Sequence, residues 1–63
     1  MTTAQAKYQA HQAAIRALIQ QLEGSLEQHQ TKAQANRGNW GYVGDIGHIE
    51  RGLNELVGFM VAS

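Results

Sequence analysis

The stretch that decides the fold is residues 39–61, which read NWGYVGDIGHIERGLNELVGFMV. It holds the only Trp and the only Phe of the chain, together with five of its seven glycines. Its large apolar residues recur at alternating intervals of four and three, which is the spacing of one face of an α-helix. They are Tyr42, Ile46, Ile49, Leu53, Leu56 and Met60. Because no alternation with a period of two persists, the pattern predicts an amphipathic helix and not a strand.

The glycines leave two interpretations open for the start of this helix. Each glycine inside a helix costs about 1 kcal/mol relative to Ala. In the first interpretation, residues 38–44 are therefore a loop and Asp45 is the N-cap. In the second, Asn39 is the N-cap and the helix covers about residues 40–61. The apolar pattern reaches back to Tyr42, which favours the second, longer helix.

A second line of residues lies on the side of this helix opposite the apolar residues, given a turn of about 100° per residue. It consists of Trp40, Gly44, Gly47 and Arg51. Glycine leaves the helix backbone bare, so that another helix can approach closely, and Trp is common at the centre of protein interfaces. We expect these four residues to bind a partner. The other interpretation of Trp40 is that it packs over the open end of a helical hairpin and closes the core.

The N-terminal half of the chain predicts another helix, over about residues 3–30, with a frayed end through Lys32 or Ala35 before Asn36 or Gly38 stops it. It is rich in Ala and Gln, contains no proline, and begins with a capping-box spacing between Thr2 and Gln5. Its large apolar residues also recur at helical spacing and are Tyr8, Ile15, Leu18, Ile19, Leu22 and Leu26. The opposite side carries Ala6, Ala10, Ala13, Ala17 and Gly24. Because alanine is the best helix former, we interpret this side as facing solvent, and a smooth ridge for helix packing is the alternative.

Length and composition indicate that this helical pair associates. A domain of 63 residues buries only about 60% of the surface that its unfolded chain exposes, and without cysteine no disulfide can support it. Fewer than ten residues link the two predicted helices, which favours an antiparallel hairpin. Two helices cannot fully cover each other's apolar residues, so we expect two hairpins to pair as a homodimeric four-helix bundle. The expected oligomer core is Tyr8, Ile15, Leu18, Leu22, Leu26, Ile46, Ile49, Leu53, Leu56 and Met60.

The sequence also argues against an enzyme, a metal site and a membrane protein. A short hairpin has no room for a substrate pocket, and the chain has no cysteine and no Ser in a nucleophile motif. His11 and His29 lie about 27 Å apart along one helix, which is too far for both to bind one metal ion. The chain has no His-x3-His pair of the kind that binds metals, so His48 has no second His close to it in the sequence. We therefore expect no cofactor and no metal. No apolar run approaches the length of about 18 residues that a membrane span requires, and the N-terminus has no hydrophobic signal segment, so the expected location is the cytoplasm.

The expected function is that of a small interaction module, an adaptor or regulator that acts by self-association and by binding a partner protein. The alternative is a nucleic-acid-binding regulator with the same dimeric helical-hairpin plan. Basic and aromatic residues suited to that role gather around the turn and the start of the second helix: Lys32, Arg37, Trp40, Tyr42 and Arg51. Five basic and five acidic residues give a formal net charge of zero, however, whereas nucleic-acid binders usually carry a basic stripe.

Overall fold

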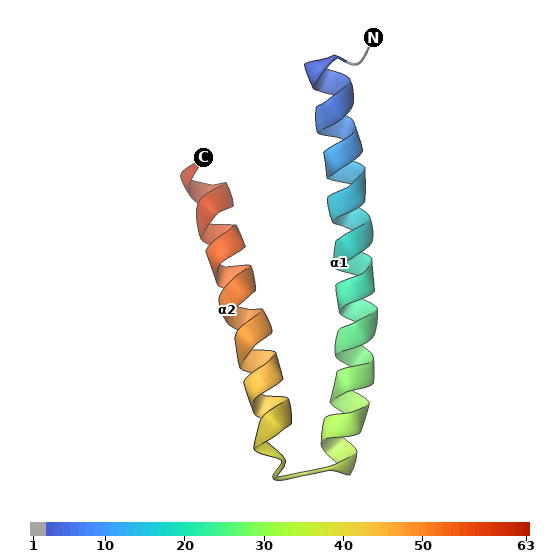
Figure 1. Cartoon of the computed structure of the whole chain (residues 1–63), viewed down its shortest axis with the longest axis vertical. Coiled ribbons are helices and arrows are strands. Elements are labelled where there is room, and N and C mark those ends of the chain that lie inside the picture. Colours follow the sequence, from blue (N-terminus) through green and yellow to red (C-terminus); the bar gives the residue numbers. More distant parts are fainter. Residues whose placement is uncertain (1–2) are drawn as a thin grey trace. The chain divides into compact units, whose positions relative to one another are not determined.

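Two α-helices joined by a short turn make up the structure, a computed structural model that describes residues 3–63 (Figure 1). Helix α1 is Ala4–Ala35 and helix α2 is Trp40–Ala62. No strand occurs among the described residues, so the predicted all-α class is confirmed. The chain divides into two units, one that ends at Lys32 and one that covers Ala33–Ser63. The antiparallel hairpin and its pairing into a four-helix bundle remain predictions.

Thr3 is the N-cap of α1. Its side-chain Oγ1 accepts a hydrogen bond from the N–H of Ala6 at 3.0 Å, and its carbonyl oxygen accepts one from the N–H of Lys7 at 3.0 Å. A Thr hydroxyl in this position satisfies one of the N–H groups that lack a partner in the first turn of a helix. The capping box predicted from Thr2 lies outside the described residues.

Helix α1 continues to Ala35, through the stretch predicted as a frayed end beyond residue 30. The predicted end followed the last large apolar residue. Residues 30–35 are Gln, Thr, Lys, Ala, Gln and Ala, and all of them except Thr are strong helix formers. Thr31 is accommodated because its Oγ1 donates a hydrogen bond to the carbonyl oxygen of Glu27, one turn earlier, at 3.2 Å. Helix propensity therefore extends α1 beyond the stretch that its apolar residues mark.

Residues 36–39 form the turn between the helices. The N–H of Asn36 donates to the carbonyl oxygen of Ala33 at 3.2 Å, and the N–H of Asn39 donates to that of Asn36 at 3.2 Å. Gly38 has a φ angle of 87°, the only positive φ among residues 3–63. A residue with a Cβ is strained in this left-handed conformation, which explains why glycine stands here.

Asn39 is the N-cap of α2, with φ −82° and ψ 104°. Its Oδ1 accepts a hydrogen bond from the N–H of Gly41 at 2.9 Å, and its carbonyl oxygen accepts one from the N–H of Tyr42 at 3.2 Å. The longer of the two predicted helices is therefore confirmed. The interpretation of residues 38–44 as a loop, with Asp45 as the cap, is wrong because Asn39 already supplies the acceptor that the first turn needs.

None of residues 3–63 is buried. Of the ten residues predicted to form an oligomer core, Leu22 and Ile49 are half-exposed and the other eight are exposed. Within the described chain, neither helix combines the length and the hydropathy that crossing a bilayer requires. The large apolar side chains of both helices thus lie at the surface, where another molecule can contact them.

Candidate functional site

The apolar stripe of α2 is the first candidate contact surface. It consists of Tyr42, Ile46, Ile49, Leu53, Leu56 and Met60, the residues that share one face at intervals of four and three. Its exposure is lowest in the first half of the helix, where Tyr42 and Ile49 are half-exposed, and it reaches 73% at Met60. The C-terminal part of the stripe therefore offers the most apolar surface for a contact.

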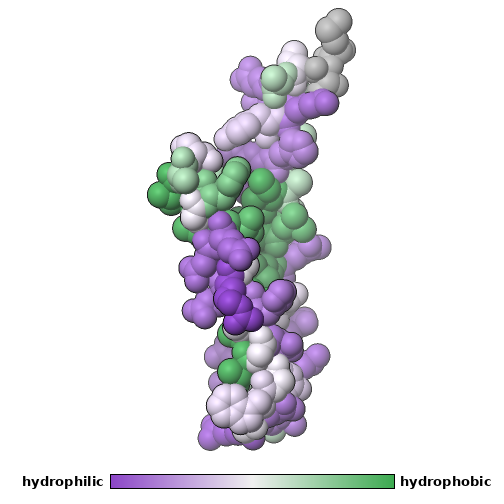
Figure 2. Space-filling model, turned by 60° about the vertical axis from the view of Figure 1, so that its left-hand side comes forward, coloured by the Kyte–Doolittle hydropathy of each residue, from purple (hydrophilic) through white to green (hydrophobic). Residues whose placement is uncertain are grey.

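The last two turns of α2 are apolar over more than one face. Val57, Phe59 and Val61 add apolar side chains outside the stripe there, and at about 100° per residue the apolar side chains of these turns span about 200° of the circumference. Figure 2 shows hydrophobic atoms gathered at the surface near this end of α2. A helix that is apolar on most of its sides is usually surrounded by protein. This end of α2 consequently favours contacts in more than one direction.

Helix α1 carries its own apolar residues along one face. Tyr8, Ile15, Leu18, Ile19 and Leu26 are exposed, and Leu22 is half-exposed. The large apolar residues are denser from Ile15 onward, because Tyr8 is the only one in the first ten residues of the helix. The main apolar surface of α1 therefore lies in its middle part.

Trp40 is the first residue of α2 and is 80% exposed. The Asn39 cap fixes this position, since the helix begins directly after the residue that accepts the hydrogen bond from Gly41. A large indole with so much exposed surface is typical of residues that bind a partner.

The other three predicted partner-binding residues lie one to three turns further along α2. A Cβ added at Gly44 would meet no atom within 4 Å, whereas one added at Gly47 would lie 3.5 Å from Nη1 of Arg51. The side chain of Arg51 therefore folds back along the helix, over the bare backbone at Gly47. The structure brings these two residues together, and the helical repeat places Trp40 and Gly44 on the same side.

Open space also surrounds the Cβ positions of Gly24, Gly52 and Gly58. No atom lies within 4 Å of any of them, so nothing in the described chain requires glycine at these positions. Each nevertheless costs its helix about 1 kcal/mol relative to Ala. The glycines leave bare helix backbone at the surface, where a neighbouring molecule can approach closely.

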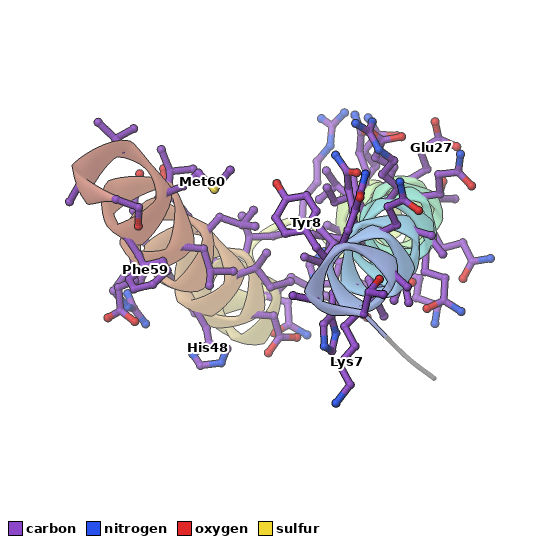
Figure 3. All side chains as sticks on the ribbon, turned by 90° about the horizontal axis from the view of Figure 1, so that it is seen from above. Lys7, Tyr8, Glu27, His48, Phe59 and Met60 are labelled. Atoms are coloured by element: carbon purple, nitrogen blue, oxygen red, sulfur yellow. The ribbon has the colours of Figure 1, made fainter. Side chains whose placement is uncertain are left out.

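Phe59 is a contact candidate that belongs neither to the apolar stripe nor to the predicted partner-binding line. It is 75% exposed. In Figure 3 its side chain and that of His48 project from one side of α2, and that of Met60 projects from another. The sequence did contain a sign of this second contact candidate: Phe59 is the only Phe of the chain, and it lies outside the apolar residues that recur every four and three positions.

The titratable side chains do not converge on one point. Among residues 3–63, no three His, Asp or Glu side chains lie where they could hold a metal ion. His11 and His29 belong to α1, and His48 belongs to α2. Comparison with protein-family models, with curated proteins and with solved structures finds no match to this chain.

Proposed function

We propose that this chain is a small, non-enzymatic helical interaction module, an adaptor or regulator that acts by self-association and by binding a partner protein. One observation supports this function above all: fourteen large apolar side chains are more than a third exposed, and none of residues 3–63 is buried. Full burial of one such side chain contributes about 1.5–3 kcal/mol. Burial of half of them contributes on the order of 10 kcal/mol before ordering costs, which is comparable with the whole stability of a small protein.

The proposed assembly is an antiparallel helical hairpin that pairs with a second copy into a four-helix bundle. Only residues 36–39 link the helices, and links this short usually join antiparallel neighbours. The apolar residues of both helices recur at the intervals with which helices interdigitate in such bundles. A two-fold dimer is the simplest assembly that covers both stripes.

Partner binding is assigned in this proposal to Trp40, Gly44, Gly47 and Arg51. The indole offers a large apolar surface, and the bare backbone at Gly44 lets a partner helix come close to it. The guanidinium of Arg51 lies over Gly47, where it can donate hydrogen bonds to a carboxylate of the partner. The partner expected from this chemistry is a helix with small residues and an acidic side chain.

The mass of the protein in solution tests self-association. Light scattering at micromolar concentration is expected to give at least twice the chain mass of 6.9 kDa. A solitary chain that unfolds cooperatively in dilute solution would contradict the proposal.

Affinity capture from the native host tests partner binding. The Trp40→Ala variant is expected to lose the proteins that the wild type captures. Val61→Ala is the control, because Val61 is as exposed as Trp40 but lies off the partner-binding line. Recovery of the same proteins by the wild type and by Trp40→Ala would show that Trp40 does not bind them.

The second candidate function is that of a nucleic-acid-binding regulator. The observation that favours it is the exposed indole of Trp40, three residues after Arg37, because bases stack on aromatic rings beside basic groups. Added salt distinguishes the two functions. Binding through phosphates weakens steeply as salt increases, whereas an apolar helical interface does not.

A further inference from the structure

Phe59 is exposed on a side of α2 that the proposed bundle core does not use. Its exposed fraction is 75%, and Figure 3 shows its side chain on a different side of the helix from that of Met60. Phe59 belongs to the last turn of α2, where the hydroxyl of the C-cap residue Ser63 donates a hydrogen bond to its carbonyl oxygen at 2.9 Å. An exposed Phe with a large apolar surface favours a contact in addition to those of the core.

The residues that share this side also recur at intervals of three and four. They are Gly41, Gly44, His48, Gly52, Glu55 and Phe59, which we call the second face of α2. At about 100° per residue these six residues lie within about 80° of the helix circumference. No atom lies within 4 Å of the Cβ positions of Gly44 and Gly52. The second face therefore has one large apolar side chain at its C-terminal end, open backbone at Gly44 and Gly52, and the polar side chains of His48 and Glu55 between them.

The second face is complementary to itself when two copies run in opposite directions. A register that places Phe59 opposite Gly44 of the second copy also places His48 opposite Glu55, and it puts the two-fold axis next to Gly52. We infer that α2 pairs with α2 of a second copy in this antiparallel register, with Phe59 of each copy seated over Gly44 of the other. The inference rests on the self-association proposed above and adds to it a contact beside the bundle core, with its face, direction and register. In this pair Phe59 of the second copy covers Gly44, so a partner protein that binds at Gly44 would compete with it.

The charges on the second face select the antiparallel direction. In that direction a ring N–H of His48 can donate to the carboxylate of Glu55 in the second copy, and the two-fold axis makes this contact twice. In a parallel pair, Glu55 would face Glu55, and the like charges would repel. Phe59 would then also face Phe59, and the open backbone at Gly44 would face itself and leave a void.

A cysteine at the two-fold axis tests the register without altering Phe59 or its seat. The chain has no cysteine of its own, so a disulfide in Gly52→Cys must join two copies. In the inferred register the two substituted positions meet at the axis, within the distance that a disulfide spans. Gly58→Cys is the matched control, since Gly58 lies on the same helix with the same open space but about 20 Å from its counterpart.

Under mild oxidation, Gly52→Cys is expected to form covalent dimers at least about tenfold faster than Gly58→Cys, because the contact raises the effective concentration of the thiols. Adding Phe59→Ala to Gly52→Cys is expected to remove this advantage, and adding Asn54→Ala is expected to keep it, because Asn54 lies on neither the apolar stripe nor the second face. Equal rates for the two cysteine variants, with wild type that is oligomeric by light scattering, would overturn the register and leave the proposed self-association standing. A monomeric wild type would overturn both.

Discussion

Two neighbouring residues, Gly38 and Asn39, separate α1 from α2. Gly38 takes the left-handed conformation that a side chain would strain, and Asn39 supplies the hydrogen-bond acceptor for the first turn of α2. Both residues act on the backbone close to them. Their contributions are therefore local, and each can be measured as a change in the free energy of unfolding.

Replacement of Asn39 by Ala is expected to lower the free energy of unfolding by about 1 kcal/mol, because the N–H of Gly41 loses its acceptor. Asn39→Asp keeps an acceptor and is expected to stay near the wild type. Urea titration followed by circular dichroism at one fixed protein concentration measures the change. Asn54→Ala is the control within α2, where Ala is the better helix former, and an equal loss there would show that Asn39 does not act as a cap.

Two Gly→Ala substitutions are expected to have opposite effects on stability. Gly38→Ala strains the left-handed turn and is expected to lower the free energy of unfolding by about 1 kcal/mol. Gly24→Ala meets no atom within 4 Å and is expected to raise it by up to about 1 kcal/mol. The same urea titration compares them, and a change of the same sign in both variants would contradict the assigned role of Gly38.

At the scale of the elements, residue spacing predicts both helices but not all of their ends. The apolar stripe identifies α2, and a similar spacing identifies α1. The end of α1 at Ala35 lies past the last large apolar residue, where helix propensity alone continues the helix. Two residues, Asn39 and Asp45, could each cap the start of α2, because Asn and Asp are both good N-cap residues. The spacing of the apolar residues, which reaches back to Tyr42, favoured Asn39 only slightly.

A charge placed on the apolar stripe is expected to prevent both assembly and folding. Leu53→Asp puts a carboxylate where the proposed core excludes water, and we expect loss of the cooperative unfolding transition together with a fall to the monomer mass. Asn54→Asp adds the same charge at the next residue, outside the stripe, and is expected to keep both properties. Circular dichroism and light scattering on the same samples measure them. A folded, oligomeric Leu53→Asp variant would exclude this stripe from the core.

At the scale of the whole molecule, the contact residues were only partly predictable from the sequence. Spacing placed Trp40 and Gly44 on one side of α2, and the structure shows that the first is exposed and the second is open. Phe59 was not predicted, because it lies outside the apolar stripe, and Gly41 and Gly44, which share its side, belong to α2 only because Asn39 is the cap. The second face combines glycines, charges and one aromatic, so it carries no apolar period that a search for hydrophobic spacing detects.

The thermal midpoint of unfolding is expected to rise with protein concentration if assembly supplies the core. Each tenfold increase in concentration adds about 1.4 kcal/mol to the stability of a dimer that unfolds to separate chains. Melting curves recorded by circular dichroism across a hundredfold range of concentration measure this shift. A midpoint that does not move, with a cooperative transition, would mean that a single chain folds alone.

The exposed indole at the beginning of α2 gives this molecule a built-in optical reporter. Trp40 is the only tryptophan in the chain, so the near-ultraviolet emission excited through indole comes from this one place. Water around the ring keeps that emission at long wavelength, and a protein surface that covers the ring and excludes water moves the emission to shorter wavelength. Contacts at this end of the helix can thus be followed by the wavelength of the intrinsic tryptophan fluorescence, with no dye attached.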